Sequence, residues 1–481
     1  MGKNTAKWKW IIIGAVLIIF AGGTYIYTGS QNSTKLVHEA DSSLHRKAKP
    51  VDIEDVPGSW KEIESEERLH EYFEERIPGL ALARKEGLTT KPEASASLPG
   101  RDGRARIYEV WHGERFIHFL YRIDLSALLS DTEGTDGIGN VPLLQSIHMK
   151  ATEDQSAQTL DLRQAGSGNR EAVIYENRLY GTISTPPVGD PWDLSDFETK
   201  VEEVNRTVPT SLTFQMNGED YETEAVPVSY VYNEEANTLK TFTTTETYEQ
   251  GGLVIKPEEV QIRASYGKMN MHIEDEHDAF NHTMQAYLKR DTGERIPVFL
   301  GYDQKENEHT YEGRFQPLGE IPDELSLVVE DVHLKEDASY SFTVDIDGMD
   351  LKESTSKRIS EKIGEARQTD IYLDSVETTS DQRMSLELSY SPHDYHQSEK
   401  LVGESFHPLP ASGKGQEEPP SFVSVQGDDG REIQADYAGT DGMATISFPT
   451  HNIQEASTLT ITVNQMVYAK EVDATFDLKP Q

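Results

Sequence analysis

The chain has 481 residues, with 84 acidic against 45 basic side chains and a formal net charge of -39 at pH 7. This charge excludes nucleic acid and anionic lipid headgroups as ligands, and it leaves divalent cations possible but without a supporting motif. The chain contains no cysteine, which excludes disulfides and thiolate chemistry, and its length predicts about three domains.

An uncharged apolar stretch near the amino terminus, WIIIGAVLIIFAGGTYIY, runs from Trp10 to Tyr27. A helix of about 17 to 20 such residues spans a bilayer, and aromatic residues at both ends suit the two interfaces. Because lysines precede the stretch and the first acid is Glu39, we predict a cytoplasmic tail at 1–9, a transmembrane helix at 10–28 and an extracellular remainder. This is the topology of a single-pass protein of the cell membrane. A cleaved signal peptide is the alternative interpretation.

The segment after the apolar stretch changes from a polar to a helical pattern. Residues 29–57 are polar and charged, which predicts a stalk. Residues 58–100 predict a helical juxtamembrane segment, in which Ser59 starts a capping box and a first helix runs to Arg76. The sequence IPG then ends this helix, and a second short helix is predicted over 80–87.

Farther along, apolar and polar residues alternate with period two, which predicts antiparallel β-structure. One two-strand phrase with the form of a β-hairpin occurs three times. Its copies are Ile107–Asp124, Glu258–Glu274 and Ile371–Tyr390. A longer phrase at Gly293–Ile346 is paralleled at Gly430–Leu478, and a more diverged version precedes both. These repeats predict three related sandwiches in tandem.

We therefore predict a mainly β fold, with tandem immunoglobulin-like β-sandwiches after the transmembrane helix and the short helical segment. The sandwiches are expected at 101–240, 241–350 and 368–481, with a linker rich in Lys, Ser and Glu at 351–367. Alternation within two strands also shows which side chains face a core. The residues expected to be buried are Leu212, Phe214, Met216, Leu459, Ile461 and Val463.

Several segments carry metal-binding residue types without the matching spacing. Asp345, Asp347 and Asp350 resemble the start of a calcium loop, but Ser356 stands where a bidentate Glu is required. A group of histidines and acids fits neither a helix face nor a strand face. Its members are His272, Glu274, Asp275, Glu276, His277, Asp278 and His282, with His393 and His396 as a weaker pair. We predict no metal site and no cofactor.

Signatures of catalysis are missing from the sequence. It has no Gly-x-Ser-x-Gly elbow, no His-Glu-x-x-His and no phosphate-binding glycine loop. Ser354 and Lys357 have Ser-x-x-Lys spacing, but the companion motifs are absent. Trp111, Trp192 and Tyr302 have the residue types of a sugar platform, although such residues usually pack inside sandwiches. We predict no catalytic residue and no enzyme.

The sequence EERIPGLALARKEGL, which starts at Glu74 and precedes the first hairpin phrase, resembles the extracytoplasmic region of DUF4179-type proteins of Gram-positive bacteria. The later repeats are similar to the immunoglobulin-like domains, such as the DUF5643 type, that accompany them. The resemblance implies relatives that are frequently anti-sigma factors with a cytoplasmic zinc-binding domain. This chain departs from them, because only about ten residues without His or Cys precede Ile11. No functional residue carries over.

The sequence as a whole predicts a non-enzymatic membrane protein whose acidic ectodomain interacts with, or senses, an envelope protein partner. Envelope signalling of the anti-sigma-factor kind is what the resemblance implies. The alternative is a structural or adhesion spacer at the cell wall. An envelope hydrolase ranks third, and it requires a deep acidic cleft in one domain.

Overall fold

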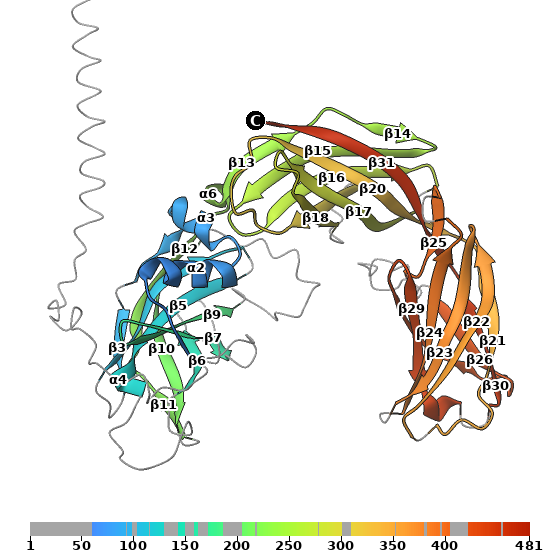
Figure 1. Ribbon diagram of the computed structural model, residues 1–481, viewed down its shortest axis with the longest axis horizontal. Helices are drawn as coiled ribbons and strands as arrows, with labels where there is room; N and C mark the ends of the chain where they lie inside the picture. Colours follow the sequence, from blue (N-terminus) through green and yellow to red (C-terminus); the bar gives the residue numbers. More distant parts are fainter. Residues whose placement is uncertain are drawn as a thin grey trace, which may run out of the picture.

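A computed structural model shows a mainly β protein, with three units arranged as an arch (Figure 1). We name these units domain 1, the barrel and the sandwich, in the order in which the chain enters them. The described residues are 60–92, 94–98, 103–114, 116–128, 143–149, 158–161, 172–185, 204–216, 219–277, 279–300, 309–351, 353–379, 382–394, 397–404, 422–453 and 456–481. No helix in these ranges combines the length and apolarity that crossing a membrane requires. The predicted tail, transmembrane helix and stalk lie outside the described residues.

Domain 1 consists of two β-sheets that enclose one core. One sheet has the order β1-β8-β9-β5-β4-β2, with β3 also on β4, and the other has the order β11-β10-β6-β7, with β12 also on β10. The strands are β1 (Lys61–Glu62), β2 (Thr89–Thr90), β3 (Ala94–Ser97), β4 (Arg104–His112), β5 (Ile117–Asp124), β6 (Leu143–Met149), β7 (Gln158–Asp161), β8 (Val173–Tyr175), β9 (Arg178–Thr185), β10 (Val204–Met216), β11 (Glu219–Glu222) and β12 (Val226–Tyr232). The short helices α4 (Leu125–Leu128) and α6 (Glu234–Asn237) follow β5 and β12.

Helices α2 (Glu66–Arg76) and α3 (Leu80–Lys85) cover the outer face of the seven-stranded sheet. The predicted helix start at Ser59 was wrong, because the side chain of Ser65 caps α2 by accepting from the backbone N–H of Arg68. The short strand β1 occupies part of the segment predicted as helix. A buried ion pair also holds the helices on the sheet, since Arg84 of α3 lies 2.8 Å from Glu109 of β4.

Eight strands of the middle unit form a closed antiparallel barrel, in the order β13-β15-β16-β19-β18-β17-β20-β31 and back to β13. The strands are β13 (Thr238–Thr243), β15 (Leu253–Arg263), β16 (Gly267–Asp275), β17 (Phe280–Arg290), β18 (Arg295–Leu300), β19 (Thr310–Phe315), β20 (Leu325–Glu336) and β31 (Met466–Pro480), extended by β14 (Tyr248–Gln250) and β25 (Glu399–Val402). Buried apolar side chains fill the interior, as is usual for eight strands.

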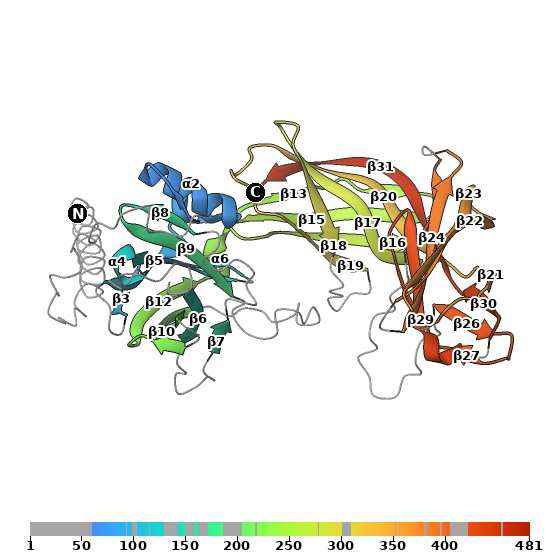
Figure 2. The same cartoon turned by 60° about the horizontal axis from the view of Figure 1, so that its bottom comes forward.

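This barrel corrects two predictions. The middle unit is not a sandwich, and the carboxy-terminal strand, which we assigned to the third sandwich, belongs to the barrel. Strand β31 pairs with β20 along most of its length and reaches β13 through Phe242↔Pro480 and Thr243↔Lys479. Closure of the barrel therefore depends on a strand more than 200 positions beyond β13. Figure 2 shows the carboxyl end beside β13, at the end of the barrel that faces domain 1.

The sandwich is inserted between β20 and β31, and it consists of two sheets around one core. Their orders are β21-β30-β26-β27 and β22-β23-β24-β29-β28. The elements are β21 (Tyr340–Asp345), β22 (Thr355–Ala366), β23 (Thr369–Thr378), β24 (Arg383–Pro392), β26 (Val423–Gly427), β27 (Glu432–Ile433), β28 (Asp436–Gly439), β29 (Met443–Pro449), η6 (Thr450–Asn452) and β30 (Thr458–Val463). The predicted linker 351–367 is mostly β22, an edge strand whose exposed Lys, Arg and Glu explain its linker-like composition.

All three copies of the hairpin phrase are confirmed as hairpins. They are β4–β5 in domain 1, β15–β16 in the barrel and β23–β24 in the sandwich. The core predictions are confirmed for Leu212, Phe214, Leu459, Ile461 and Val463, which are all buried, whereas the side chain of Met216 is not among those described.

Candidate functional sites at the two domain junctions

The junction between domain 1 and the barrel is closed by apolar packing. Phe73, Leu80 and Trp111 of domain 1 share one buried cluster with Ala264, which follows barrel strand β15. Gly79 lies at a close approach of the two units, because a Cβ there would stand 1.9 Å from the carbonyl oxygen of Ala264. Its φ of +86° also favours glycine. The sequence IPG therefore serves as the contact that lets α3 meet the barrel.

An ionic contact supplements this apolar cluster. Arg263, at the end of β15, is only 3% exposed. Its guanidinium lies 3.2 Å from Glu114 in the β4–β5 turn and 2.9 Å from Glu234 in α6. Because Glu114 belongs to domain 1 and Arg263 to the barrel, the pair ties the two units together.

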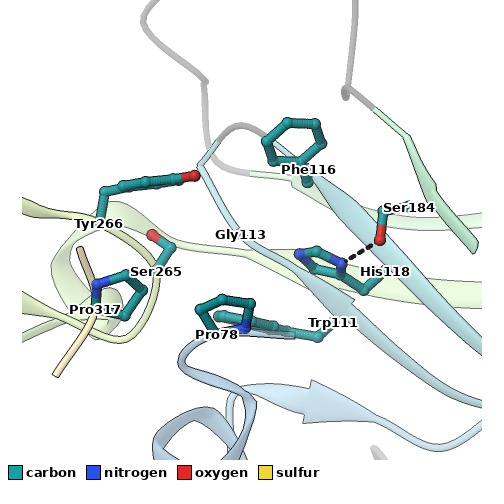
Figure 3. A pocket seen from close by; sticks show the side chains of 9 residues that line it. All are labelled: Pro78, Trp111, Gly113, Phe116, His118, Ser184, Ser265, Tyr266 and Pro317. Atoms are coloured by element: carbon teal, nitrogen blue, oxygen red, sulfur yellow. Dashed lines mark hydrogen bonds between the residues drawn. The ribbon is translucent and has the colours of Figure 1, made fainter. Parts of the chain in front are cut away.

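A cavity of about 180 Å³ opens at the same junction (Figure 3). It is lined by Pro78, Trp111, Gly113, Phe116, His118, Ser184, Ser265, Tyr266 and Pro317. The lining is mostly apolar, but the indole Nε1 of Trp111 and the Oγ of Ser265 are buried without a hydrogen-bond partner among the described residues. Both groups donate hydrogen bonds, but both atoms are closed to a water-sized molecule, so an acceptor on a bound molecule would reach them only after a side-chain movement.

Histidine 118 of the cavity is neutral at pH 7. Its ring stacks on Trp111 with 5.2 Å between ring centroids, and its Nδ1 lies 2.6 Å from Ser184 Oγ. Burial lowers the pKa of His118 to about 4, and burial has the same effect on the pKa of neighbouring His112. No described carboxylate contributes to the pKa of His118. A Ser–His pair with so weak a base and no orienting acid suits binding better than nucleophilic catalysis.

The barrel and the sandwich are connected by two strands that run side by side. Strand β20 leads into β21 and β30 leads into β31, each through a few residues. The last barrel pair, Glu336↔Met466, is followed on the sandwich side by Tyr340↔Val463. The β-ladder is thus nearly continuous across this junction, which makes the second junction a covalent two-strand hinge.

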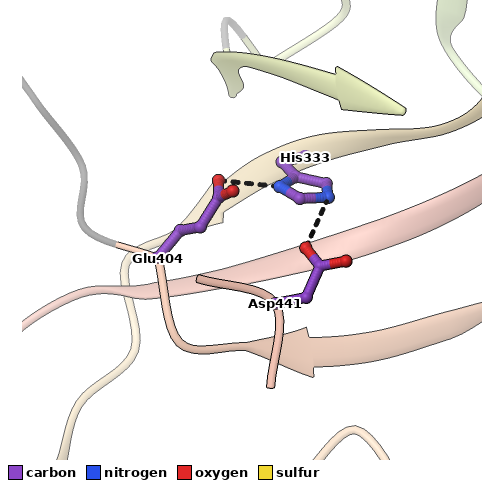
Figure 4. Close-up of side chains that lie close together, drawn as sticks. All are labelled: His333, Glu404 and Asp441. Atoms are coloured by element: carbon purple, nitrogen blue, oxygen red, sulfur yellow. Dashed lines mark hydrogen bonds and ion pairs between the residues drawn. The ribbon is translucent and has the colours of Figure 1, made fainter. Parts of the chain in front are cut away.

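A buried histidine lies beside this hinge (Figure 4). His333 of β20 is 1% exposed, and its Nδ1 lies 2.7 Å from Glu404, which follows β25. Its Nε2 lies 3.2 Å from Asp331 Oδ1 and 3.6 Å from Asp441 Oδ1 in the β28–β29 turn. Burial opposes a charge on this ring, but the contacts with Asp331 and Glu404 outweigh it and raise the pKa of His333 to about 9.

Two glycines bring the acidic loops of the sandwich together. A Cβ on Gly439 would stand 1.8 Å from the carbonyl oxygen of Gly403, and a Cβ on Gly403 would stand 2.5 Å from that of Met443. The segments can therefore pack tightly enough for Glu404 and Asp441 to face the same imidazole.

A second cluster, on the sandwich surface, combines Glu365, Asp370 and His393. Asp370 lies 2.8 Å from His393 Nε2 and 2.7 Å from Lys362 Nζ, and Lys362 also lies 2.7 Å from Glu365. Because the lysine ammonium pairs with both carboxylates on the surface, the cluster is an exposed ion-pair network. The lowered pKa of Asp370, about 2, has the contacts with Lys362 and His393 as its main causes.

The other residues considered from sequence do not converge. Among the described residues, neither group of metal-type ligands includes His272, His277 or His282. Asp345 and Asp347 lie in an exposed turn in which Asp345 accepts from the backbone of Asp347. Trp111 is buried, as the core interpretation favoured. The remaining candidates, Trp192, Asp278, Tyr302 and His396, lie outside the described residues.

Sequence reasoning missed the cluster at His333. Its four members are 331, 333, 404 and 441 in the chain, so no local spacing marks them. The one usable signal is the alternation in β20, where Asp331 and His333 lie on the strand face opposite the core residues Val332 and Leu334.

No known protein family and no curated protein matches the sequence. Among solved structures, the chain is similar to the conserved domain protein from Bacillus anthracis, with 13% identity and a TM-score of 0.25 over 55% of this chain and 83% of that one. At this TM-score, the similarity carries no inference about function.

Proposed function

We propose that the protein is a single-pass membrane protein whose acidic extracytoplasmic ectodomain binds a partner in the bacterial cell envelope and catalyses no reaction. The observation that carries this proposal is the uncharged stretch Trp10–Tyr27, preceded by lysines and followed by more than 400 largely β-forming residues. Immunoglobulin-like character of domain 1 and the sandwich, and membership of the DUF4179/DUF5643 group, are part of the same proposal. They rest on the hairpin repeats and on the IPG segment at α2–α3.

The cavity between domain 1 and the barrel is the place where we expect the partner to bind. Its apolar lining favours an apolar or aromatic side chain, and a side-chain movement that exposes the unpaired donors of Trp111 and Ser265 would let them bind a carbonyl beside it. Because His118 is neutral at pH 7, its ring does not select for a charged group in the cavity.

A photoreactive amino acid in place of Phe116, at the cavity, tests this function in intact cells. We expect a reproducible crosslink to one envelope protein, and we expect the Ser265→Leu substitution, which fills the cavity, to abolish it. A probe in place of Thr292, in an exposed barrel turn, is the control and should capture nothing reproducible. Equal capture from both positions, or capture that survives Ser265→Leu, would contradict the proposal.

The alternative function is a passive spacer, which the arch and the two-strand hinge also support. A spacer needs its length but not its cavity. Normal cell-envelope behaviour in the Ser265→Leu variant, together with a defect when the sandwich is deleted, would favour this alternative.

A further inference from the structure

The charges around His333 do not balance. Three carboxylates, Asp331, Glu404 and Asp441, surround one imidazole that is 1% exposed. Even a protonated ring leaves two negative charges uncompensated. Asp441 is 43% exposed, but the side chains of Asp331 and Glu404 are only 11% and 18% exposed, and unpaired charge is costly there. The other groups facing the cluster are Gln285, whose amide donates to Asp441 Oδ2, and Lys400, which acts on Asp441 at longer range. A divalent cation would bring the cluster closer to neutrality than a proton does.

Two buried atoms of the cluster are also unsatisfied. His333 Nε2 and Asp331 Oδ1 each lack a hydrogen-bond partner among the described residues, although they lie 3.2 Å apart. The distance suits an ion pair, but the angles do not suit a hydrogen bond. Buried polar atoms of this kind call for a specific explanation, and an ion between them is one.

The two distances from Nε2 suit ligands of one metal ion, and Glu404 is placed as a supporting carboxylate. Glu404, 2.7 Å from Nδ1, is placed to hold the proton on that nitrogen and leave the Nε2 lone pair free for a metal. Nε2 faces Asp331 Oδ1 at 3.2 Å and Asp441 Oδ1 at 3.6 Å. Ligand atoms of a zinc ion with bonds of about 2.0 to 2.1 Å stand roughly 3.4 Å apart in tetrahedral geometry.

We propose that His333 Nε2, Asp331 and Asp441 bind one divalent ion of the zinc class, with Glu404 as the positioning residue for the imidazole. A nitrogen ligand selects this class over calcium or magnesium. Since Asp331 and His333 belong to the barrel and Asp441 to the sandwich, the ion would lock the hinge between them. This inference does not depend on the membrane topology or on the cavity at the other junction.

Zinc titration of the full-length chain, purified in detergent and stripped of metal, tests the proposal by competition with a chromophoric chelator. We expect one saturable zinc ion per chain and a rise in the melting temperature of the barrel and sandwich. Calcium at the same concentration should produce neither effect. The substitution Asp441→Asn, at a half-exposed position that tolerates change, should weaken zinc binding at least tenfold, and His333→Gln should abolish it. Glu404→Gln should weaken binding while the stoichiometry stays at one.

The exposed cluster supplies the matched control, because His393→Gln removes a histidine that also contacts an aspartate. This variant should bind zinc within twofold of the unmodified chain. Absence of saturable zinc binding would overturn the proposal and leave an ion-paired imidazolium as the account of the cluster. Zinc binding that survives both Asp441→Asn and His333→Gln, or that disappears in His393→Gln, would also overturn it.

Discussion

The two junctions of the barrel are built on opposite principles. Domain 1 meets the barrel through apolar side chains, a glycine contact and the cavity residue His118, whose pKa is lowered to about 4. The sandwich meets it through two continuous strands and a histidine whose pKa is raised to about 9 by carboxylates. The same residue type thus takes opposite charge states at the two ends of one barrel. Apolar packing closes the first junction, whereas charged side chains meet at the second.

The largest expected effect comes from breaking the close contact of the apolar junction. Gly79→Ala forces an L-residue into φ +86° and places a methyl group 1.9 Å from a backbone oxygen, so we expect a loss of about 3 kcal/mol or more. Gly87→Ala is the matched control, because it has φ +72° with nothing within 4 Å. It should cost about 1 to 2 kcal/mol. Hydrogen exchange of α2–α3 measures the difference, and equal losses in the two variants would refute the close contact.

Alkali should loosen the second junction. The pKa of His333 is about 9 when folded against 6.5 in the unfolded chain, so its contribution is fully present below pH 6.5 and is lost as pH rises through 9. The shift corresponds to about 3 kcal/mol. In metal-free protein, hydrogen-exchange protection of β25 and the β28–β29 turn should fall between pH 7 and 10. His333→Gln should remove this pH dependence, whereas His393→Gln should keep it; identical profiles in both variants would count against the assignment.

Acid should loosen domain 1 beside the first junction. His112 is 2% exposed and has a folded pKa of about 4, so the unfolded chain binds its proton first. Its stabilising contribution is present above pH 6.5 and is lost as pH falls through 4, a change of about 3 kcal/mol. Protection of β4 and β5 should therefore decrease from pH 7 to 4 while the sandwich, measured in the same samples, stays protected. A uniform response of both units would remove the contrast between the junctions.

The smallest effect is expected at the ionic contact of the apolar junction. Glu114→Gln removes one of two acidic partners of Arg263, and Glu234 remains at 2.9 Å. Because both glutamates are partly exposed, we expect about 1 kcal/mol, with greater loss at low salt. Denaturant unfolding at two salt concentrations measures it. A loss as large as that of Gly79→Ala would mean that charge, not packing, closes this junction.

The sequence predicts local pairings well and global closure poorly. Each hairpin phrase could be recognised because its two strands are neighbours and the alternation of residues marks their buried faces. The barrel could not be recognised, because β31 and β13 meet across more than 200 residues and alternate just as sandwich strands do. The exposed charged residues of β22 also led to the prediction of a linker, because an edge strand and a linker share that composition.

The residues of the two candidate sites could not be recognised for the same reason. His333 acquires its role from Glu404 and Asp441, which reach it through tight glycine contacts in another unit. The cavity likewise needs Trp111 from domain 1 and Ser265 from the barrel. The spacing of residues in the sequence can predict sites within a single helix, strand or loop. Both candidate sites combine residues from two units, so no spacing marks them.

Surface labelling of a single cysteine tests the proposed topology most directly, because the chain has no cysteine of its own. Thr292→Cys places a thiol in an exposed turn of the barrel, and Asn4→Cys places one in the predicted cytoplasmic tail. A membrane-impermeant maleimide applied to intact cells should label position 292 fully and position 4 only after lysis. Labelling of position 292 only after lysis would contradict an extracytoplasmic ectodomain.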